Sequence, residues 1–271
     1  YGNIEDLVIH INFATPKGLI SKQCQVPRIS SGPDLHHVIM GSEGTLGVVT
    51  EATIKVFPLP EVKRYGSLVF PDFDHGVAFF REVARQRIQP ASLRLVDNVQ
   101  FVMGQALRLA ERTYWASLKH SISFLYLTKW RGFDMEKMCA ATCIFEGTAD
   151  EVHRAEKRLY TLAQKYEGVV GGEERGKYGY RLTFAIAYDL GMEFGVLGES
   201  FETSVPWDKV LNLCRNVKEV IKRKSKELGV KWTIISCRIP QLYDAGVCVY
   251  FYFGFSSRGL SNPLEVYDEI E

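Results

Sequence analysis

One glycine-rich stretch separates two kinds of sequence in this chain: Gly41-Ser42-Glu43-Gly44-Thr45-Leu46-Gly47-Val48-Val49-Thr50. The residues that follow, Glu51 to Val56, alternate polar and apolar side chains as a β-strand does. The dinucleotide motif G-x-G-x-x-G follows a strand and opens a helix, so the reversed order here excludes it. Closely spaced glycines permit positive φ and let backbone N–H groups approach a ligand. The loop is therefore predicted either to hold a flat polar cofactor or to connect two packed elements tightly.

Composition indicates an ordinary globular protein. The 271 residues are 46% hydrophobic and 24% charged, with a formal net charge of +1. A balanced charge gives no global electrostatic reason to bind nucleic acid. No window approaches 18 uninterrupted apolar residues, so no transmembrane span is expected. The six cysteines form no C-x-x-C pair and have no metal-site spacing, which favours a reducing compartment and no metal.

The first 60 residues predict a small β-rich region. Alternating apolar residues over 6–13, the turn Thr15-Pro16-Lys17-Gly18 and the return at 19–20 indicate a hairpin. Asp34 is expected to cap a short helix that reaches Met40. Adjacent side chains on a helix diverge, so one of the neighbouring residues His36 and His37 is predicted to be buried and the other exposed. Pro58-Leu59-Pro60 ends the pattern, and the domain boundary is placed after residue 64, giving domains 1–64 and 65–271.

The rest of the chain alternates strands with helices. Strands are predicted at 67–70, 91–96, 141–145, 195–203, 232–239 and 247–255. Helices are predicted at 73–87, 101–124 and 207–228, and a Thr148–Glu151 capping box should open another that stops at Gly168. This alternation predicts an α+β domain whose antiparallel sheet is covered on one side by helices.

Two side chains stand out as candidates for chemistry. Tyr250 and Tyr252 share one face of their strand, and a buried phenol beside a partner is a general acid or base. The alternative is a tyrosine packed in the sheet. Arg94 lies between Leu93 and Leu95, so it points to the opposite face of its strand. A guanidinium suits phosphate because its planar fork binds bidentately, although a surface ion pair with a carboxylate is equally compatible.

Five strings of sequence resemble the FAD-linked oxidases related to vanillyl-alcohol oxidase, and within that family the ether-lipid synthases. Besides the glycine loop they are Tyr1-Gly2-Asn3-Ile4-Glu5-Asp6-Leu7-Val8, Ser31-Gly32-Pro33-Asp34-Leu35-His36-His37, Leu197-Gly198-Glu199-Ser200-Phe201-Glu202-Thr203-Ser204, and Tyr243-Asp244-Ala245-Gly246 with Tyr250-Phe251-Tyr252-Phe253. The resemblance implies the end of an FAD-binding domain followed by most of a substrate-binding cap domain.

The function implied by the resemblance is a step of ether-lipid and plasmalogen synthesis. The acyl chain of acyl-dihydroxyacetone phosphate is exchanged for a long-chain fatty alcohol, with FAD as cofactor and no net redox change. Segments 101–127 and 247–255 are candidates to line a tunnel for the alkyl chain. The resemblance also implies peripheral membrane association, a homodimer and a peroxisomal location.

The resemblance assigns roles to individual residues. Flavin contacts fall on Glu43, Gly44, Thr45, Leu46, Gly47, Val48 and Val49, proton transfer on Tyr250, and a role in activity on Arg94. The family's catalytic His-His-His string is expected beyond Glu271. A phosphate-binding arginine that the family carries after an Ala-Tyr pair has no counterpart, because Ala187-Tyr188 continues as Asp189-Leu190. Arg181 is the nearest substitute.

Two other functions fit parts of the sequence. The glycine loop alone is equally compatible with an FAD-linked oxidase or dehydrogenase of a hydroxy acid or phenol. The missing arginine is compatible with an inactive relative that scaffolds a partner enzyme.

Overall fold

The chain divides into two compact units, each with its own sheet, Tyr1–Leu59 and Pro60–Glu271. The computed structural model describes residues 3–22, 24, 26–30, 32–109, 125–182 and 193–271. The boundary expected after residue 64 falls inside strand β4, Val62–Phe70. Val62 already pairs with Gly147 of the second unit, so the division lies a few residues earlier than expected.

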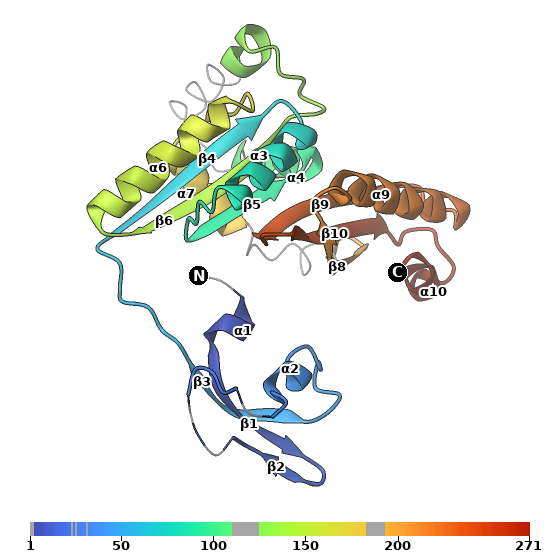
Figure 1. Cartoon of the computed structure of the whole chain (residues 1–271). Coiled ribbons are helices and arrows are strands. Elements are labelled where there is room, and N and C mark those ends of the chain that lie inside the picture. The colour runs from blue at the N-terminus through green and yellow to red at the C-terminus, as the bar shows by residue number, and fades with distance from the viewer. Residues whose placement is uncertain (1–2, 23, 25, 31, 110–124, 183–192) are drawn as a thin grey trace. The chain divides into compact units, whose positions relative to one another are not determined.

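The smaller unit is a three-stranded antiparallel sheet in the order β2-β1-β3. Its elements are α1 Ile4–Leu7, β1 Val8–Thr15, β2 Gly18–Ile20, α2 His36–Ile39 and β3 Val48–Ile54 (Figure 1). The predicted hairpin and the strand after the glycine loop are confirmed. The core of this unit is small, because Ile11, Phe13 and Ile39 are its only buried hydrophobic side chains within the described residues.

The two adjacent histidines differ in burial as predicted. His36 is 5% exposed, and its Nε2 accepts a hydrogen bond from the N–H of Ile11. The side chain of His37 is 67% exposed. Asp34 Oδ1 accepts the N–H of His36 at 3.0 Å, which helps to start α2.

The larger unit is built on a seven-stranded sheet in the order β7-β4-β6-β5-β9-β10-β8. Every pairing in it is antiparallel. After β4, its strands are β5 Ser92–Val96, β6 Cys139–Gly147, β7 Val169–Val170, β8 Val196–Pro206, β9 Thr233–Leu242 and β10 Gly246–Ser256. All six predicted strands are present, with ends that differ by a few residues.

Three long helices cover one face of this sheet and form the main core with it. They are α3 Phe73–Arg85, α6 Ala149–Gln164 and α9 Val210–Glu227 (Figure 1). Local sequence starts two of them: Asp72 accepts the N–H of His75 at α3, and the predicted Thr148–Glu151 capping box opens α6. Each helix then buries one apolar stripe against the sheet.

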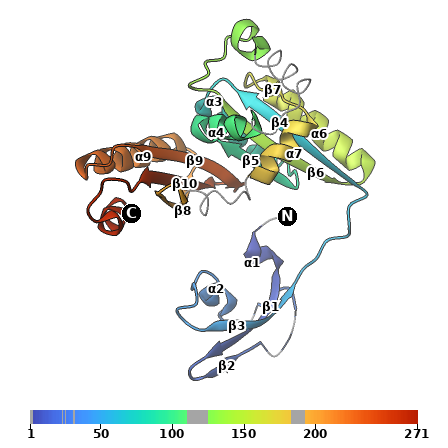
Figure 2. The ribbon, with the colours of Figure 1, turned by 180° about the vertical axis from the view of Figure 1, so that it is seen from behind.

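The opposite face also carries helices, so the prediction of cover on one side needs correction. Helix α4, Asn98–Leu109, and helix α7, Glu173–Leu182, lie on this second face, as Figure 2 shows from behind. Helix α7 approaches closely because Gly176 has no side chain: a Cβ there would lie 2.4 Å from the carbonyl oxygen of Gly66. The sequence reading missed α7.

The remaining elements are short. They are the π-helix η1, Tyr126–Trp130, and the C-terminal helix α10, Pro263–Ile270, which was also not predicted. The predicted helix over 101–124 starts earlier, at Asn98, and its part beyond residue 109 lies outside the described residues. None of the helices in the described part of the chain combines the length and apolar character needed to cross a membrane.

Candidate active site

The glycine loop of the smaller unit has positive φ angles, a backbone conformation that glycine adopts more easily than other residues. Gly41 and Gly44 have φ values of 82° and 76°, and Glu43 between them also has a positive φ, 48°. A Cβ at Gly41 or Gly44 would meet nothing within 4 Å. The N–H groups of Glu43 and Gly44 have no acceptor among the described residues. Open space beside unpaired donors fits the edge of a flat polar cofactor.

Gly47 serves a different purpose from the other two glycines. Its φ is not positive, and a Cβ there would lie 2.3 Å from the carbonyl oxygen of Ala14 and 2.8 Å from Cε1 of Phe13. Gly47 therefore lets the loop pack directly onto β1. The predicted segment Glu43–Val49 thus divides into an open part around Gly44 and a packing part around Gly47. A groove beside the loop is lined by Ile11, Phe13, Ile39, Met40, Gly41, Ser42, Glu43, Gly44, Gly47, Val48 and Val49.

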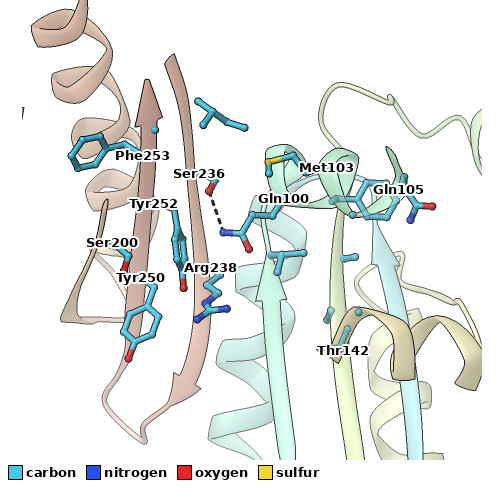
Figure 3. A pocket seen from close by; sticks show the side chains of 18 of the residues that line it. Gln100, Met103, Gln105, Thr142, Ser200, Ser236, Arg238, Tyr250, Tyr252 and Phe253 are labelled. Carbon is cyan, nitrogen blue, oxygen red and sulfur yellow. Dashed lines mark hydrogen bonds between the residues drawn. The ribbon is translucent and has the colours of Figure 1, made fainter. Parts of the chain in front are cut away.

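The larger unit holds a cavity of about 820 Å³ on the second face of its sheet. That volume lies within the range of about 300–1,000 Å³ usual for small-molecule sites. Both segments predicted to line a tunnel contribute: Phe101, Met103 and Leu127 from one, Tyr252 and Phe253 from the other. Figure 3 shows the cavity between α4 and β9–β10.

The floor of the cavity contains a row of side chains set by strand register. Val96 pairs with Arg238, Arg238 with Tyr250, and Tyr250 with Glu202. All four residues line the cavity. The Arg238 guanidinium carbon lies 5.2 Å from the centre of the Tyr250 ring and 4.9 Å from that of Tyr252 (Figure 3). These cation–π contacts hold the guanidinium against two phenol rings.

Tyr250 is half-buried and keeps its proton. A hydrogen bond to the Glu202 carboxylate, together with burial, raises the pKa of Tyr250 to about 12. A neighbouring negative charge disfavours the phenolate, so Tyr250 is a proton donor at neutral pH. The Glu202 side chain lies next to the Tyr250 hydroxyl and accepts its hydrogen bond.

Arg94 lies on the same sheet face but does not itself line the cavity. It sits opposite Thr142 in the ladder, and its guanidinium carbon lies 4.8 Å from the centre of the Tyr180 ring on α7. Burial lowers the pKa of Arg94, and the charge of Arg238 acts in the same direction. The structure thus brings Arg94 and Tyr250 to one face, two strands apart.

Asp97 connects the strands and the helix that carry the site. This buried carboxylate accepts the N–H of Cys237 at 2.9 Å and the N–H of Gln100 at 3.1 Å, and it contacts Lys218 Nζ. It therefore ties the start of α4 to the residue before Arg238. Gln100 Nε2 in turn donates to Ser236 Oγ at 3.1 Å inside the cavity (Figure 3).

The proposed substitute for the missing arginine is only partly described. Arg181 belongs to α7, but its side chain lies outside the described residues, as do Ala187, Tyr188, Asp189 and Leu190. The sequence reading missed Arg238, Glu202, Gln100 and Ser236. A signal existed for two of them, since Ser236 and Arg238 alternate with the apolar Cys237 and Ile239 in a predicted strand.

A family comparison identifies the larger unit. Residues 59–271 match the model "FAD linked oxidases, C-terminal domain". The chain belongs to the FAD-linked oxidase family. FAD is the cofactor of this family, and the glycine loop of the smaller unit has the open space and free donors that the cofactor needs.

Individual FAD-linked oxidases narrow the relationship. An alkyldihydroxyacetonephosphate synthase of Caenorhabditis elegans is 68% identical over 274 residues, covering 100% of this chain and 46% of the relative. The synthase of Dictyostelium discoideum is 27% identical and covers 93% of this chain and 41% of the relative. A solved alkyldihydroxyacetonephosphate synthase shares the fold, with a TM-score of 0.73 at 24% identity over 100% of this chain and 48% of that one. The chain thus spans about half the length of these relatives.

Proposed function

We propose that the protein containing this chain is an alkyldihydroxyacetonephosphate synthase. It exchanges the acyl chain of acyl-dihydroxyacetone phosphate for a long-chain fatty alcohol and releases a fatty acid. The observation that carries the proposal is one cavity whose lining combines a cation and a phenol with apolar side chains. Arg238 and Tyr250 line the cavity together with Phe101, Met103 and Leu127. A substrate with a charged head and an alkyl chain matches that mixed lining.

The residues of this chain would divide the work as follows. Bound FAD would supply the activation of the substrate carbon, with no net oxidation or reduction of the substrate. Gly41, Glu43 and Gly44 would hold the cofactor through backbone groups. Tyr250 moves a proton at the substrate carbon, and Glu202 accepts the hydrogen bond of its hydroxyl. The bond between carbon and acyl oxygen breaks, the bond to the alcohol oxygen forms, and the alcohol proton leaves with the fatty acid.

Long-chain alcohols partition into membranes, so the proposal includes peripheral membrane association. Met103 and Trp232 support it, because both line the cavity and are still 40% and 51% exposed. Both therefore place apolar side chains where the cavity meets the protein surface. A homodimer and a peroxisomal location complete the proposal by resemblance. Sedimentation of the full-length protein with liposomes tests the membrane part.

The test of the activity uses the full-length protein loaded with FAD. Labelled hexadecanol and acyl-dihydroxyacetone phosphate should give labelled alkyl-dihydroxyacetone phosphate, while the flavin absorbance stays unchanged. Bleaching of the flavin by a 2-hydroxy acid, without label incorporation, would instead identify a dehydrogenase. Absence of both reactions would leave a scaffolding relative.

A further inference from the structure

Arg238 is a cation in the cavity that has no acidic partner in the described part of the chain. Its strand neighbours Cys237 and Ile239 are buried on the face covered by α3, α6 and α9, so Arg238 points to the other face. Two acids line the same cavity, but Glu202 accepts a hydrogen bond from Tyr250, and Glu199 accepts one from Tyr267. Within the described residues, Arg238 forms no ion pair, and its buried Nε has no hydrogen-bond acceptor.

A second guanidinium lies near this one. Arg94 is half-buried on the adjacent strand and is close enough for the charge of Arg238 to lower its pKa further, in addition to the effect of burial. Two like charges at half-buried positions repel each other, and the low local dielectric makes the repulsion stronger than in water. An anion bound near the two guanidinium groups would relieve that repulsion.

We propose that Arg238 binds the phosphate group of the substrate, a role that rests on the proposed function. A guanidinium offers a planar fork that matches two phosphate oxygens, and the rings of Tyr250 and Tyr252 already hold that fork in place. This assignment supplies the cation that is missing after Ala187-Tyr188. It also places the phosphate beside Tyr250, in the same cavity that Phe101 and Met103 line.

Phosphate binding is measured directly on the full-length FAD-loaded protein. The probe is glycerol 3-phosphate, and isothermal titration calorimetry measures its affinity. Arg238→Gln should weaken its binding roughly 10- to 100-fold, the range expected when a hydrogen bond to a charged group is lost. The KM for acyl-dihydroxyacetone phosphate should rise by a similar factor. Arg215→Gln is the matched control, because Arg215 is exposed on α9, against the other face of the sheet, and its change should alter neither value.

Several outcomes would overturn the assignment. The assignment is wrong if Arg238→Gln binds glycerol 3-phosphate with wild-type affinity. It is also wrong if the wild-type protein does not bind the probe at millimolar concentration. Loss of flavin absorbance from Arg238→Gln would show that the anion is the pyrophosphate of FAD. If Arg238→Gln does not fold, Arg238→Lys decides: a severalfold loss of affinity supports the assignment, and wild-type affinity overturns it.

The same experiment separates this inference from the proposed function. If the wild-type protein binds glycerol 3-phosphate through Arg238 but exchanges no alcohol, the proposed reaction fails while the phosphate site stands. If exchange proceeds and Arg238→Gln leaves both probe affinity and KM unchanged, the reaction stands and the site fails.

Discussion

Strands β3 and β10 show how differently the two units treat similar apolar sequence. In β10, Val249, Phe251 and Phe253 are buried, and Tyr250 and Tyr252 on the opposite face line the cavity. In β3, Val48 and Ile54 remain 65% and 55% exposed, although the strand alternates in the same way. An alternating strand buries one face only where another layer covers it.

The contrast indicates where the stability of each unit comes from. The larger unit has a continuous core that joins three helices to the sheet. The smaller unit buries only Ile11, Phe13 and Ile39 as hydrophobic side chains within its described residues. Bound FAD would add stability to the smaller unit by mass action. The larger unit should therefore be insensitive to the cofactor and the smaller one dependent on it.

The largest expected effect lies in the core of the larger unit. Phe79 is fully buried on α3, with its ring centre 5.1 Å from that of Phe70. Phe79→Ala should lower the free energy of unfolding by about 3–5 kcal/mol, because it leaves a cavity. Urea denaturation of the full-length protein followed by circular dichroism measures it. Leu59→Ala is the control, since Leu59 is 95% exposed and its change should stay within about 0.5 kcal/mol.

Tyr250→Phe should affect activity far more than stability. It removes the hydroxyl that is bonded to Glu202 and almost no volume. Exchange of labelled alcohol should fall roughly 10²–10⁴-fold if Tyr250 transfers the proton. Loss of its hydrogen bond should cost only about 0.5–1.5 kcal/mol of stability. Tyr252→Phe, on the same face, should keep most activity, and the reverse result would move the role to Tyr252.

Gly44→Val tests the cofactor dependence of the smaller unit. A β-branched residue at φ 76° is strained by about 1–3 kcal/mol, and its side chain would enter the open space beside the loop. The full-length variant should lose its flavin, as read from absorbance after gel filtration. Gly32→Val has a similar strain at φ 70° but lies outside the loop, so it should retain FAD. Equal loss from both variants would make strain alone responsible.

Arg94→Lys should reduce exchange roughly tenfold, about 1.4 kcal/mol, because lysine keeps the charge but loses the fork that stacks on Tyr180. Thermal unfolding should change little by comparison. Steady-state kinetics beside a melting curve measures both effects. An unchanged rate would remove Arg94 from the site.

The smallest effect concerns the cap of α3 and depends on pH. Burial opposes the shift, but hydrogen bonds from the His75 N–H and ring lower the pKa of Asp72 below its ordinary value. A lowered carboxyl pKa stabilises the fold above the unfolded value of about 3.9, and this contribution is lost as pH falls through the folded value. Asp72→Ala should therefore cost about 1 kcal/mol at pH 7 and at pH 5. The difference from wild type should shrink below about pH 4 in urea titrations; a constant difference would contradict the ionic cap.

The sequence by itself determined the local elements and the nature of the loop. The capping box at Thr148–Glu151 and the apolar stripe of α9 depend on residues that are close together in sequence, so both were predictable. The open conformation at Gly44 follows from glycine alone. Strings around Arg94 and Tyr250 named both residues through resemblance, without showing that they share a face.

Tertiary structure alone decided which side chains meet. Arg238 reaches Tyr250 only because β9 pairs with β10 in one register, and it approaches Arg94 only because β5 pairs with β9. Register between strands so far apart in sequence depends on long-range packing, which no local pattern records. The buried Asp97 shows the same limit, since its partners Cys237 and Lys218 lie more than a hundred residues away. Burial of a strand face is likewise a property of the covering layer, which is why β3 and β10 differ.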